Sequence, residues 1–580
     1  MDKKSIIVVT LCVVLMLLWG PITHLIFPPK PKTVSKLSAT SENAQAADNA
    51  LDNIPLPSAA EKSPDKIWGT SKVPPVKSNK TARPPESPKI SVIENAQLRI
   101  ELSNIGGGVQ RFILKEHFNH HLDNDSTDNV VINCQYANKD GLQIPGFVLI
   151  GIDDLSPETI FSTTDASDEV VYETTTPAGI NIRKTYNLSR ESDYGPILLI
   201  EINNNSGKSL SLKKVFMTMG TIGPLTTTES AAYIGFDLFE KPSVIRKHYD
   251  TVKKEPFESN NPLSWVAIKN QFFTLIVQPY QFPASGFYAE SISAPEKPNT
   301  FAALLGVGDQ TIASGESISL EYKIYAGPKE FKRLRELGDN KDQVMAFDVF
   351  MGMTLKIFGY ITQMLLAILI YINSYVHNFG LAIVIITVFI KIIYWPLTGH
   401  ATNSMKKMAA LQPRLTTIRD KYKDNPQKLQ QEMMKMYREY KVNPFSGCLP
   451  GLLQFPVFLA FYSMLQSAIE LRGAKFLWIK DLSQPDTIFH LFNVSWLPVN
   501  PMPLIMAASM FVQMQMTPMS GDPAQKKIFM LMPVIFLVFC YNFSSGLSLY
   551  WTVQNLLTIL QTWLSLRKKD PLFEKLQSSK

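Results

Sequence analysis

The stretch GLAIVIITVFIKIIYWPLT, residues 380–398, decides the fold of this chain. It is apolar, it is long enough to cross a bilayer, and its only ionisable side chain is Lys391. An ammonium group at membrane depth costs about 2.5–3.5 kcal/mol on insertion scales. The protein must therefore keep Lys391 hydrated or paired with another group.

The other apolar segments near the C-terminus offer Lys391 no ion partner, because residues 449–469, 501–517, 528–542 and 547–566 contain neither Asp nor Glu. They do contain uncharged polar side chains that can form hydrogen bonds: Gln454, Ser509, Gln513, Gln515, Asn542, Thr552, Gln554, Asn555 and Gln561. A lone cation among such neighbours favours a water-filled cavity. The alternative is snorkelling, since Lys391 lies roughly 10 Å from Thr398 at 1.5 Å per residue.

Composition limits the chemistry that this chain can carry. With 580 residues and a net charge of +7, the chain is long enough for two or three domains, and its apolar stretches indicate an integral membrane protein. The four cysteines, at 12, 134, 448 and 540, have neither the spacing of a disulfide framework nor that of a zinc site. No nucleotide-binding motif occurs, so we expect no use of ATP. We also expect that the protein has no cofactor or metal and is not an enzyme.

The N-terminal region predicts an anchor followed by a linker. Residues 6–27 are apolar, follow Lys3 and Lys4, and are compatible with a signal peptide or an anchor. No small-x-small cleavage site follows, so we predict that 1–27 is a retained anchor with its N-terminus in the cytoplasm. Residues 28–88 hold eleven prolines and predict a flexible linker, the alternative being an ordered extension of the next domain.

Residues 89–340 predict a large all-β sandwich outside the cytoplasm, because short β-branched runs alternate with Asn, Gly, Asp and Pro clusters. His117, His120 and His121 raise the possibility of a metal site, but no second cluster supports it, and we interpret them as solvated loop histidines. The Gly106-Gly107-Gly108 sequence lacks the Lys-Ser/Thr of a phosphate loop. It predicts a turn instead.

The positive-inside bias sets the topology of the next segments. Residues 399–443 hold ten Lys or Arg against four Asp or Glu, and would face outward if both 345–376 and 380–398 crossed the membrane. We therefore predict that 345–376 is an amphipathic helix at the outer interface and that 380–398 crosses inward.

The basic loop, 399–443, predicts an antiparallel helical hairpin, because apolar residues recur every three or four positions on either side of Asn425-Pro426. Its basic residues form either a solvated face or a surface that attracts anionic phospholipid or ribosomal RNA. Its methionines suit an adaptable contact surface, although core packing explains some of them equally well. The candidate contact residues are Lys406, Lys407, Met408, Arg414, Met433 and Arg438.

Four more spans complete a count of six that satisfies the charge of every short flank. The last five spans and the hairpin form a core at 380–566, and a basic tail at 567–580 lies in the cytoplasm.

Several motifs together resemble the YidC/Oxa/Alb family of membrane protein insertases. In the membrane region these are Tyr394-Trp395-Pro396-Leu397-Thr398, Leu411-Gln412-Pro413, Gln431-Glu432-Met433-Met434, Val442-Asn443-Pro444, Gly447-Cys448-Leu449-Pro450, Gln454-Phe455-Pro456-Val457-Phe458 and Ser545-Gly546-Leu547. Outside it, Gly106-Gly107, Trp265-Val266-Ala267 and Tyr325-Ala326-Gly327-Pro328-Lys329 are similar to the periplasmic domain of the Gram-negative form.

The resemblance implies a multi-pass protein of the bacterial inner membrane with a periplasmic β-sandwich and five core spans around a hydrophilic groove, open to cytoplasm and lipid. It places Lys391 in the groove, where the family usually has arginine, with Thr387 at a polar groove position and Tyr550 with Trp551 as an aromatic pair. The other candidate groove residues are Gln454, Gln515 and Asn555. Lysine keeps the charge but loses the planar fork of arginine.

The implied function is insertion and folding of nascent membrane proteins, alone or with the Sec translocon, by a monomeric core. The hairpin would receive the chain from the ribosome or a targeting factor, and Lys391 would attract a polar or acidic tail into the groove. Two other functions stay open at this point. A small-anion transporter would call for inverted repeats, and a membrane-anchored carbohydrate enzyme would call for paired carboxylates; we find neither pattern.

Overall fold

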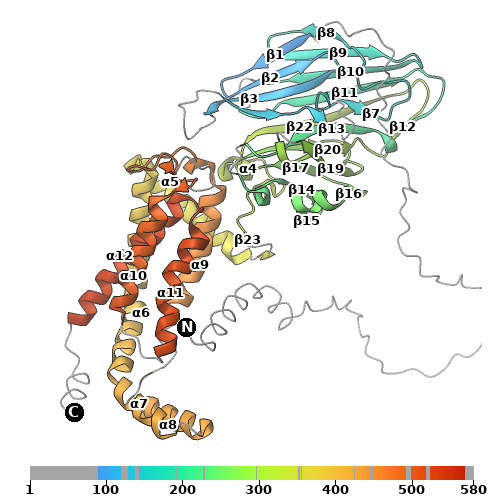
Figure 1. Ribbon diagram of the computed structural model, residues 1–580. Coiled ribbons are helices and arrows are strands. Elements are labelled where there is room, and N and C mark those ends of the chain that lie inside the picture. Colours follow the sequence, from blue (N-terminus) through green and yellow to red (C-terminus); the bar gives the residue numbers. More distant parts are fainter. Residues whose placement is uncertain are drawn as a thin grey trace, which may run out of the picture. The chain divides into compact units, whose positions relative to one another are not determined.

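The computed structural model describes residues 89–567 except 119–128, 138–142, 190–192, 226–228, 295–296, 351–352, 355, 423–424, 441, 443–448, 492–497 and 518–522 (Figure 1). The predictions for 1–27, 28–88 and 568–580 therefore lie outside the described residues, as do His120, His121 and Cys448. The chain separates into two units, residues 1–73 with 521–532 and residues 74–520 with 533–580. The description below concerns the second unit, which holds the β-sheets and most of the helices.

The first part of this unit is built from antiparallel sheets. One sheet has nine strands in the order β15-β14-β17-β18-β22-β11-β10-β9-β8, a second has five in the order β16-β19-β20-β13-β7, and a third has four in the order β1-β2-β3-β4. The strands are β1 Ile90–Glu94, β2 Leu98–Ser103, β3 Gly108–Phe118, β4 Asn129–Asn133, β7 Leu149–Ile150, β8 Ser162–Asp165, β9 Glu169–Thr175, β10 Ile180–Asn187, β11 Ile197–Asn204, β13 Phe216–Ile222, β14 Gly235–Glu240, β15 Ser243–His248, β16 Phe257–Ser259, β17 Trp265–Lys269, β18 Phe273–Pro279, β19 Phe287–Ala294, β20 Lys297–Gly306 and β22 Ser317–Pro328.

Short elements complete the β-domain. They are two-stranded pairs of β5 Tyr136–Ala137 with β6 Gln143–Ile144 and of β12 Leu210–Ser211 with β21 Thr311–Ile312, the helices α3 Tyr249–Lys254 and α4 Phe331–Glu336, and the 3₁₀ turns Leu212–Lys214, Ala231–Tyr233 and Lys341–Met345.

The sheets pack face to face as the alternating sequence pattern predicts. Buried and less buried side chains alternate along β10 and β11, so one face of these strands is apolar. Between the nine-stranded and five-stranded sheets, the ring of Phe236 lies 4.8 Å from that of Phe287 and 5.7 Å from that of Phe301. These ring contacts form the centre of a β-sandwich core.

The turn at Gly106-Gly107 is confirmed, and a buried cation stabilises it. Both glycines have positive φ, 66° and 54°, which side chains with a Cβ rarely adopt. The Lys184 ammonium, which is fully buried, donates hydrogen bonds to Gly106 O at 2.7 Å, Gly107 O at 3.3 Å and Phe147 O at 2.9 Å. Lys184 was not singled out from the sequence, although it is in phase with Ile182 and Tyr186 on the buried face of β10.

The interpretation of His117 as a solvated loop histidine is wrong. His117 lies in β3, where its ring packs edge-on against Phe273 at 5.5 Å. Burial, with the nearby charges of Arg472 and Arg333, lowers the pKa of His117 to about 4. It is a neutral packing residue at physiological pH. The described residues contain no cluster of three or more His, Cys, Asp or Glu side chains suited to a metal.

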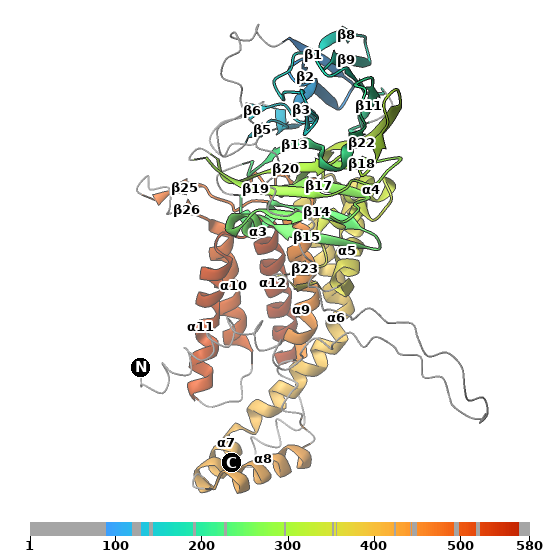
Figure 2. The same ribbon diagram turned by 90° about the vertical axis from the view of Figure 1, so that its right-hand side faces the viewer.

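The second part of the unit is helical. Its helices are α5 Lys356–Val376, α6 Phe379–Ala410, α7 Gln412–Lys421, α8 Pro426–Glu439, α9 Leu449–Ser467, α10 Pro501–Met516 and α12 Ser545–Arg567 (Figure 2). Helix α11, Pro523–Cys540, belongs to this unit from Pro533 onward. Two short hairpins pair β23 Val349–Phe350 with β24 Met353–Thr354 and β25 Phe489–His490 with β26 Pro498–Val499. Among the described residues, two segments are long and apolar enough to cross a membrane, 358–376 in α5 and α6 itself.

Helix α6 is longer than the predicted span. It begins after Asn378, whose side chain accepts a hydrogen bond from Leu381 N at 2.9 Å, and it continues through Pro396 for 32 residues. At 1.5 Å per residue this is about 48 Å, more than the ~30 Å apolar layer of a bilayer. The expected hairpin boundary at 399 therefore falls inside a continuous helix, and the hairpin consists of α7 and α8. Asn425 caps α8 as predicted.

Helix α5 begins later than the interfacial helix predicted at 345–376. A 3₁₀ turn ends at Met345, the paired strands β23 and β24 follow, and the helix begins at Lys356. Thr362, Leu365, Leu366 and Leu369 form a buried stripe that faces α6 and α9, whereas Tyr360, Met364, Tyr371 and Tyr375 are exposed. This amphipathic pattern is what an interfacial helix requires, and its orientation in a membrane remains a prediction.

Candidate functional site

Lys391 is buried between helices α6 and α12. The residue is 3% exposed, and its Nζ donates a hydrogen bond to Thr558 Oγ1 at 2.9 Å. Within the described part of the chain, Lys391 forms no ion pair. The sequence predicted this lack of a carboxylate partner, because the surrounding apolar segments contain none.

Thr558 connects Lys391 to a chain of polar groups that reaches α9. The Thr558 hydroxyl donates to Gln554 O at 2.7 Å, one turn earlier in α12. The Gln554 side-chain Nε2 donates to Gln454 Oε1 of α9 at 2.9 Å, and Gln454 Nε2 is hydrogen-bonded to the Tyr550 hydroxyl. Three helices thus contribute to one polar network next to the buried cation.

The network extends along the contact between α6 and α12 away from the start of α6. Thr398 Oγ1 and Gln561 Oε1 lie 3.0 Å apart, and Gln561 Nε2 donates to Trp395 O at 3.0 Å. Further along both helices, Ser565 Oγ donates to Asn403 Oδ1 at 3.1 Å and Lys406 Nζ donates to Ser565 O. Polar contacts therefore continue from Lys391 to the end of α12.

The other predicted groove residues take different positions. Asn555, which is buried, donates to Ser509 Oγ of α10 at 2.9 Å. Thr387 is fully buried and donates to Ile383 O in its own helix at 2.6 Å. Gln515 is exposed near the end of α10, so the structure does not place it with the buried polar group.

The two aromatic residues of the predicted pair in α12 pack against different neighbours. Tyr550 is 1% exposed and its ring stacks on Phe461 at 4.2 Å. Trp551, the next residue, packs edge-on against Phe458 at 4.8 Å and against Phe536 of α11 at 5.2 Å. Both aromatic residues therefore hold α12 against its neighbours, and only Tyr550 also joins the polar network.

Thr558 is a candidate site residue that sequence reasoning missed. Its position follows a recognisable spacing, because Gln554, Thr558 and Gln561 recur at intervals of four and three and so share one face of α12. A single threonine in an apolar helix is an ordinary occurrence, and only the structure shows that this one accepts a hydrogen bond from Lys391.

The hairpin has a small hydrophobic core and an exposed charged surface. Leu411, Leu415, Met436 and Val442 are buried, and Met408 and Met433 pack against them. Core packing thus accounts for both methionines that were predicted to contact a substrate. Arg414 and Arg438 are exposed, Lys407 is half-buried, and Lys406 is hydrogen-bonded to Ser565 as described above.

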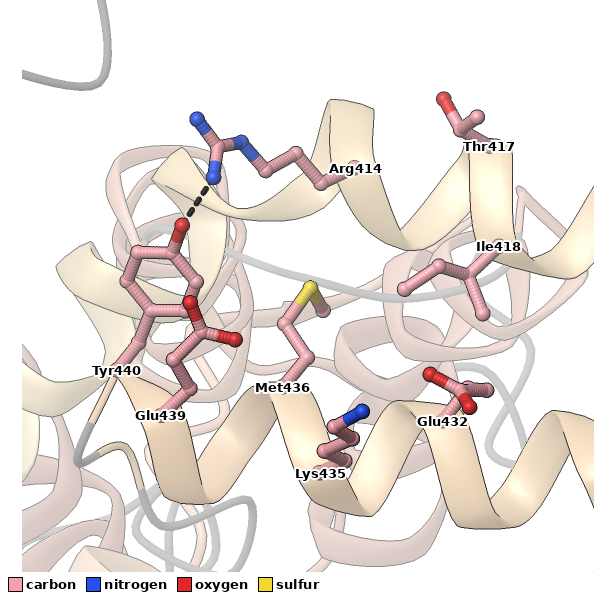
Figure 3. A pocket seen from close by; sticks show the side chains of 8 residues that line it. All are labelled: Arg414, Thr417, Ile418, Glu432, Lys435, Met436, Glu439 and Tyr440. Atoms are coloured by element: carbon pink, nitrogen blue, oxygen red, sulfur yellow. Dashed lines mark hydrogen bonds between the residues drawn. The ribbon is translucent and has the colours of Figure 1, made fainter.

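Between the two hairpin helices lies an open cavity of about 390 Å³ (Figure 3). Arg414 of α7 is hydrogen-bonded to Tyr440 after α8 at one end, and Met436 lies at its floor. The remaining lining residues are Thr417, Ile418, Glu432, Lys435 and Glu439.

Comparison with known proteins agrees with this architecture. Residues 91–360 match the family described as the YidC periplasmic domain, and residues 371–571 match the 60Kd inner membrane protein family. The membrane protein insertases YidC of Syntrophobacter fumaroxidans and Syntrophus aciditrophicus are each 31% identical, over 97% of this chain and 99% of theirs. A crystal structure of an active YidC insertase is 19% identical, with a TM-score of 0.34 over 83% of this chain and 94% of that one.

A β-domain followed by helices around a buried cation, together with identities of this extent, defines a membrane insertase of the bacterial inner membrane. The chain belongs to the YidC family.

Proposed function

We propose that this protein inserts nascent membrane proteins through a hydrophilic groove centred on Lys391, without catalysing a chemical reaction. The observation that carries the proposal is the hydrogen-bonding state of that ammonium. The Lys391 ammonium group has three N–H donors. One of them forms a hydrogen bond with the hydroxyl of Thr558, a neutral partner. Among the described residues, this is the hydrogen bond that Nζ donates. A buried cation with further N–H donors attracts water or an anionic group, and the acidic tail of a substrate supplies the latter.

The polar network supports an entry route from the cytoplasm. Hydrogen-bonded polar groups lie along α6 and α12 from Lys391 to Ser565, next to the hairpin that begins after Ala410. They reduce the cost of bringing a polar tail partway into the bilayer. Beside Lys391, Phe389, Ile392 and Ile393 are exposed apolar residues of α6, which suits lateral release of an apolar segment into lipid.

The proposed topology has six spans with both termini in the cytoplasm and the β-domain in the periplasm. The anchor at 1–27 is the first span and α5 lies at the outer interface. Helices α6, α9, α10, α11 and α12 form the core, which acts as a monomer. This path leaves the basic hairpin in the cytoplasm, as the positive-inside bias requires.

The proposed partners follow from this path. Nascent membrane proteins are the substrates, and the hairpin receives them from the ribosome or a targeting factor. Its exposed Arg414 and Arg438 add attraction to anionic phospholipid. We also propose that the protein inserts its substrates alone or together with the Sec translocon.

Reversal of the charge at position 391 tests the groove. In reconstituted vesicles, Lys391→Glu should abolish insertion of a substrate with a short acidic outer tail, because the buried carboxylate repels that tail. Lys391→Arg is the matched control, since it keeps the charge and should insert close to normally. Normal insertion by Lys391→Glu would refute the electrostatic role.

A further inference from the structure

The loop between α9 and α10 contains a tight turn with two exposed apolar residues at its tip. Phe476 and Ile479 pair through two backbone hydrogen bonds of 3.0 and 2.9 Å, which leaves Leu477 and Trp478 as the two central residues. Leu477 is 75% exposed and Trp478 is 44% exposed. Leu477 also has a φ of 52°, in the left-handed region.

Such a turn is unfavourable in water. Two-residue hairpin turns with positive φ usually carry Gly, Asn or Asp, because these residues tolerate the left-handed region and are solvated well. Leu477 and Trp478 instead expose large apolar surfaces at the tip of the turn. An apolar surrounding for the tip would remove this cost.

Contacts with the first residues of α6 and α12 fix the level of the turn relative to these helices. A Cβ on Gly380 would lie 2.2 Å from the ring of Phe476, so the turn rests directly on the first residues of α6. Asn378 Nδ2, at the cap of α6, donates to Lys475 O at 3.4 Å. The same loop accepts hydrogen bonds from the start of α12, from Ser545 N to Gln484 O at 2.8 Å and from Gly546 N to Leu482 O at 2.9 Å.

In the proposed topology, the first residues of α6 and α12 are the outer ends of two membrane spans. Apolar and indole side chains at this level match the interfacial aromatic belt of membrane proteins. The Trp478 Nε1 donates to Asp486 Oδ2 at 3.1 Å, which holds the indole ring at the base of the tip. Lys475 and Lys480 are exposed on either side, where lysine side chains reach lipid phosphates.

From this placement we propose that residues 475–480 form a lipid-binding wedge, in which Leu477 and Trp478 enter the outer leaflet and the flanking lysines face anionic phospholipid headgroups. The proposal rests on the topology given above and goes beyond the groove. The wedge fixes the depth of the outer ends of α6 and α12, the two helices that hold Lys391 and Thr558.

Depth measurement on the full-length protein in anionic nanodiscs tests the wedge. Leu477→Cys, in a chain whose four native cysteines are replaced by alanine, is labelled with a nitroxide. The accessibilities to oxygen and to a water-soluble nickel complex are then measured. Tyr280→Cys in the β-domain, also at an exposed position, is the control. We expect the oxygen-to-nickel accessibility ratio to be higher at 477 than at 280.

Three outcomes would overturn the proposal. A ratio at 477 equal to that at 280 means that the tip lies in water, and exclusion of both reagents means that protein covers it. The third concerns Lys475→Cys in spheroplasts, which should react with an impermeant maleimide added outside. If it reacts only after lysis, the topology itself is wrong. If the cysteine at 475 reacts from outside but the accessibility ratio at 477 equals that at 280, the topology is right and the wedge is wrong.

A second measurement uses the native tryptophan and does not depend on the labelled variants. Phospholipids with brominated acyl chains should quench part of the fluorescence of the unmodified protein, and Trp478→Phe should remove a distinct share of that quenching. Quenching that is unchanged in Trp478→Phe would contradict insertion of the indole ring.

Discussion

At the residue scale, the Lys391–Thr558 contact accounts for how a cation is held within apolar helices. Thr558 Oγ1 accepts a hydrogen bond from Lys391 Nζ and donates one to Gln554 O, so its lone pair faces the ammonium group. This contact orients the ammonium group of Lys391.

Thr558→Val should destabilise the helical core by about 1–3 kcal/mol, because it leaves a buried charged donor without its acceptor. Thr552→Val is the matched control, since the Thr552 hydroxyl bonds to Ser548 O in its own helix. Thermal unfolding in detergent measures both. In a Lys391→Met background, Thr558→Val should have little further effect. An equal cost in the two backgrounds would show that the contact does not matter.

Lys184 presents a different case, a lysine buried in the β-domain against three carbonyl oxygens. Burial lowers the pKa of Lys184 to about 7, from an ordinary value near 10.4. Between about pH 7 and 10 the unfolded chain therefore binds a proton that the folded chain does not. The stability of the β-domain should rise with pH across this window.

Lys184→Met should reduce that rise by up to about 1.4 kcal/mol per pH unit, the contribution of one proton. The rise should not vanish, since burial also lowers the pKa of Lys329 to about 7. In a chain where Cys134 is the only cysteine, its rate of labelling measures how often the domain opens, because the thiol is buried. Dividing the labelling rate of the variant by that of the parent at each pH cancels the titration of the thiol itself. Exposed Lys213→Met is the control and should leave the slope unchanged; an unchanged slope in Lys184→Met would contradict the assignment.

At the scale of elements, Gly380 and Phe476 determine how the outer loop meets α6. Gly380 has helical geometry, but its Cα faces the ring of Phe476 at a distance that leaves no space for a methyl group. Gly399, in the same helix, faces open space apart from Gln561 Nε2 at 3.8 Å. The two glycines therefore have opposite expected responses to substitution.

Gly380→Ala should destabilise the protein by about 1–3 kcal/mol through overpacking. Gly399→Ala should be neutral or stabilising by up to about 1 kcal/mol, the usual gain of alanine over glycine inside a helix. Unfolding temperatures in detergent compare the pair, and Phe476→Ala should rescue Gly380→Ala. Equal effects at the two positions, or no rescue, would contradict the close packing of loop and helix.

The sequence pattern predicted the core helices and a β-domain, but not how α6 ends. The Asn425-Pro426 capping signal correctly predicted the start of α8, because an N-cap and a first-turn proline act locally. Pro396 does not mark a helix end, since α6 continues through it to Ala410. Likewise the count of polar side chains predicted that Lys391 has neutral neighbours, but the choice of Thr558 over Thr387 depends on how α6 and α12 pack against each other.

At the scale of the whole molecule, the chain combines a β-sandwich with a helical core whose polar contacts concentrate between α6, α9 and α12. Membership in the YidC family accounts for both parts, which match separate family descriptions in sequence order. The groove, the six-span path and the partners remain our proposals, and each depends on substrate reaching Lys391.

The most direct test of that claim places a photo-crosslinking amino acid at position 391 and exposes the protein to a ribosome-stalled membrane protein with an acidic tail. We predict a crosslink between position 391 and the substrate, and its loss when the tail is shortened so that it no longer reaches the groove. The same probe at Ile392, an exposed apolar position next to it, is the control for contact through lipid. Crosslinks from 391 to lipid alone, or crosslinks from 391 and 392 in equal yield, would contradict the account.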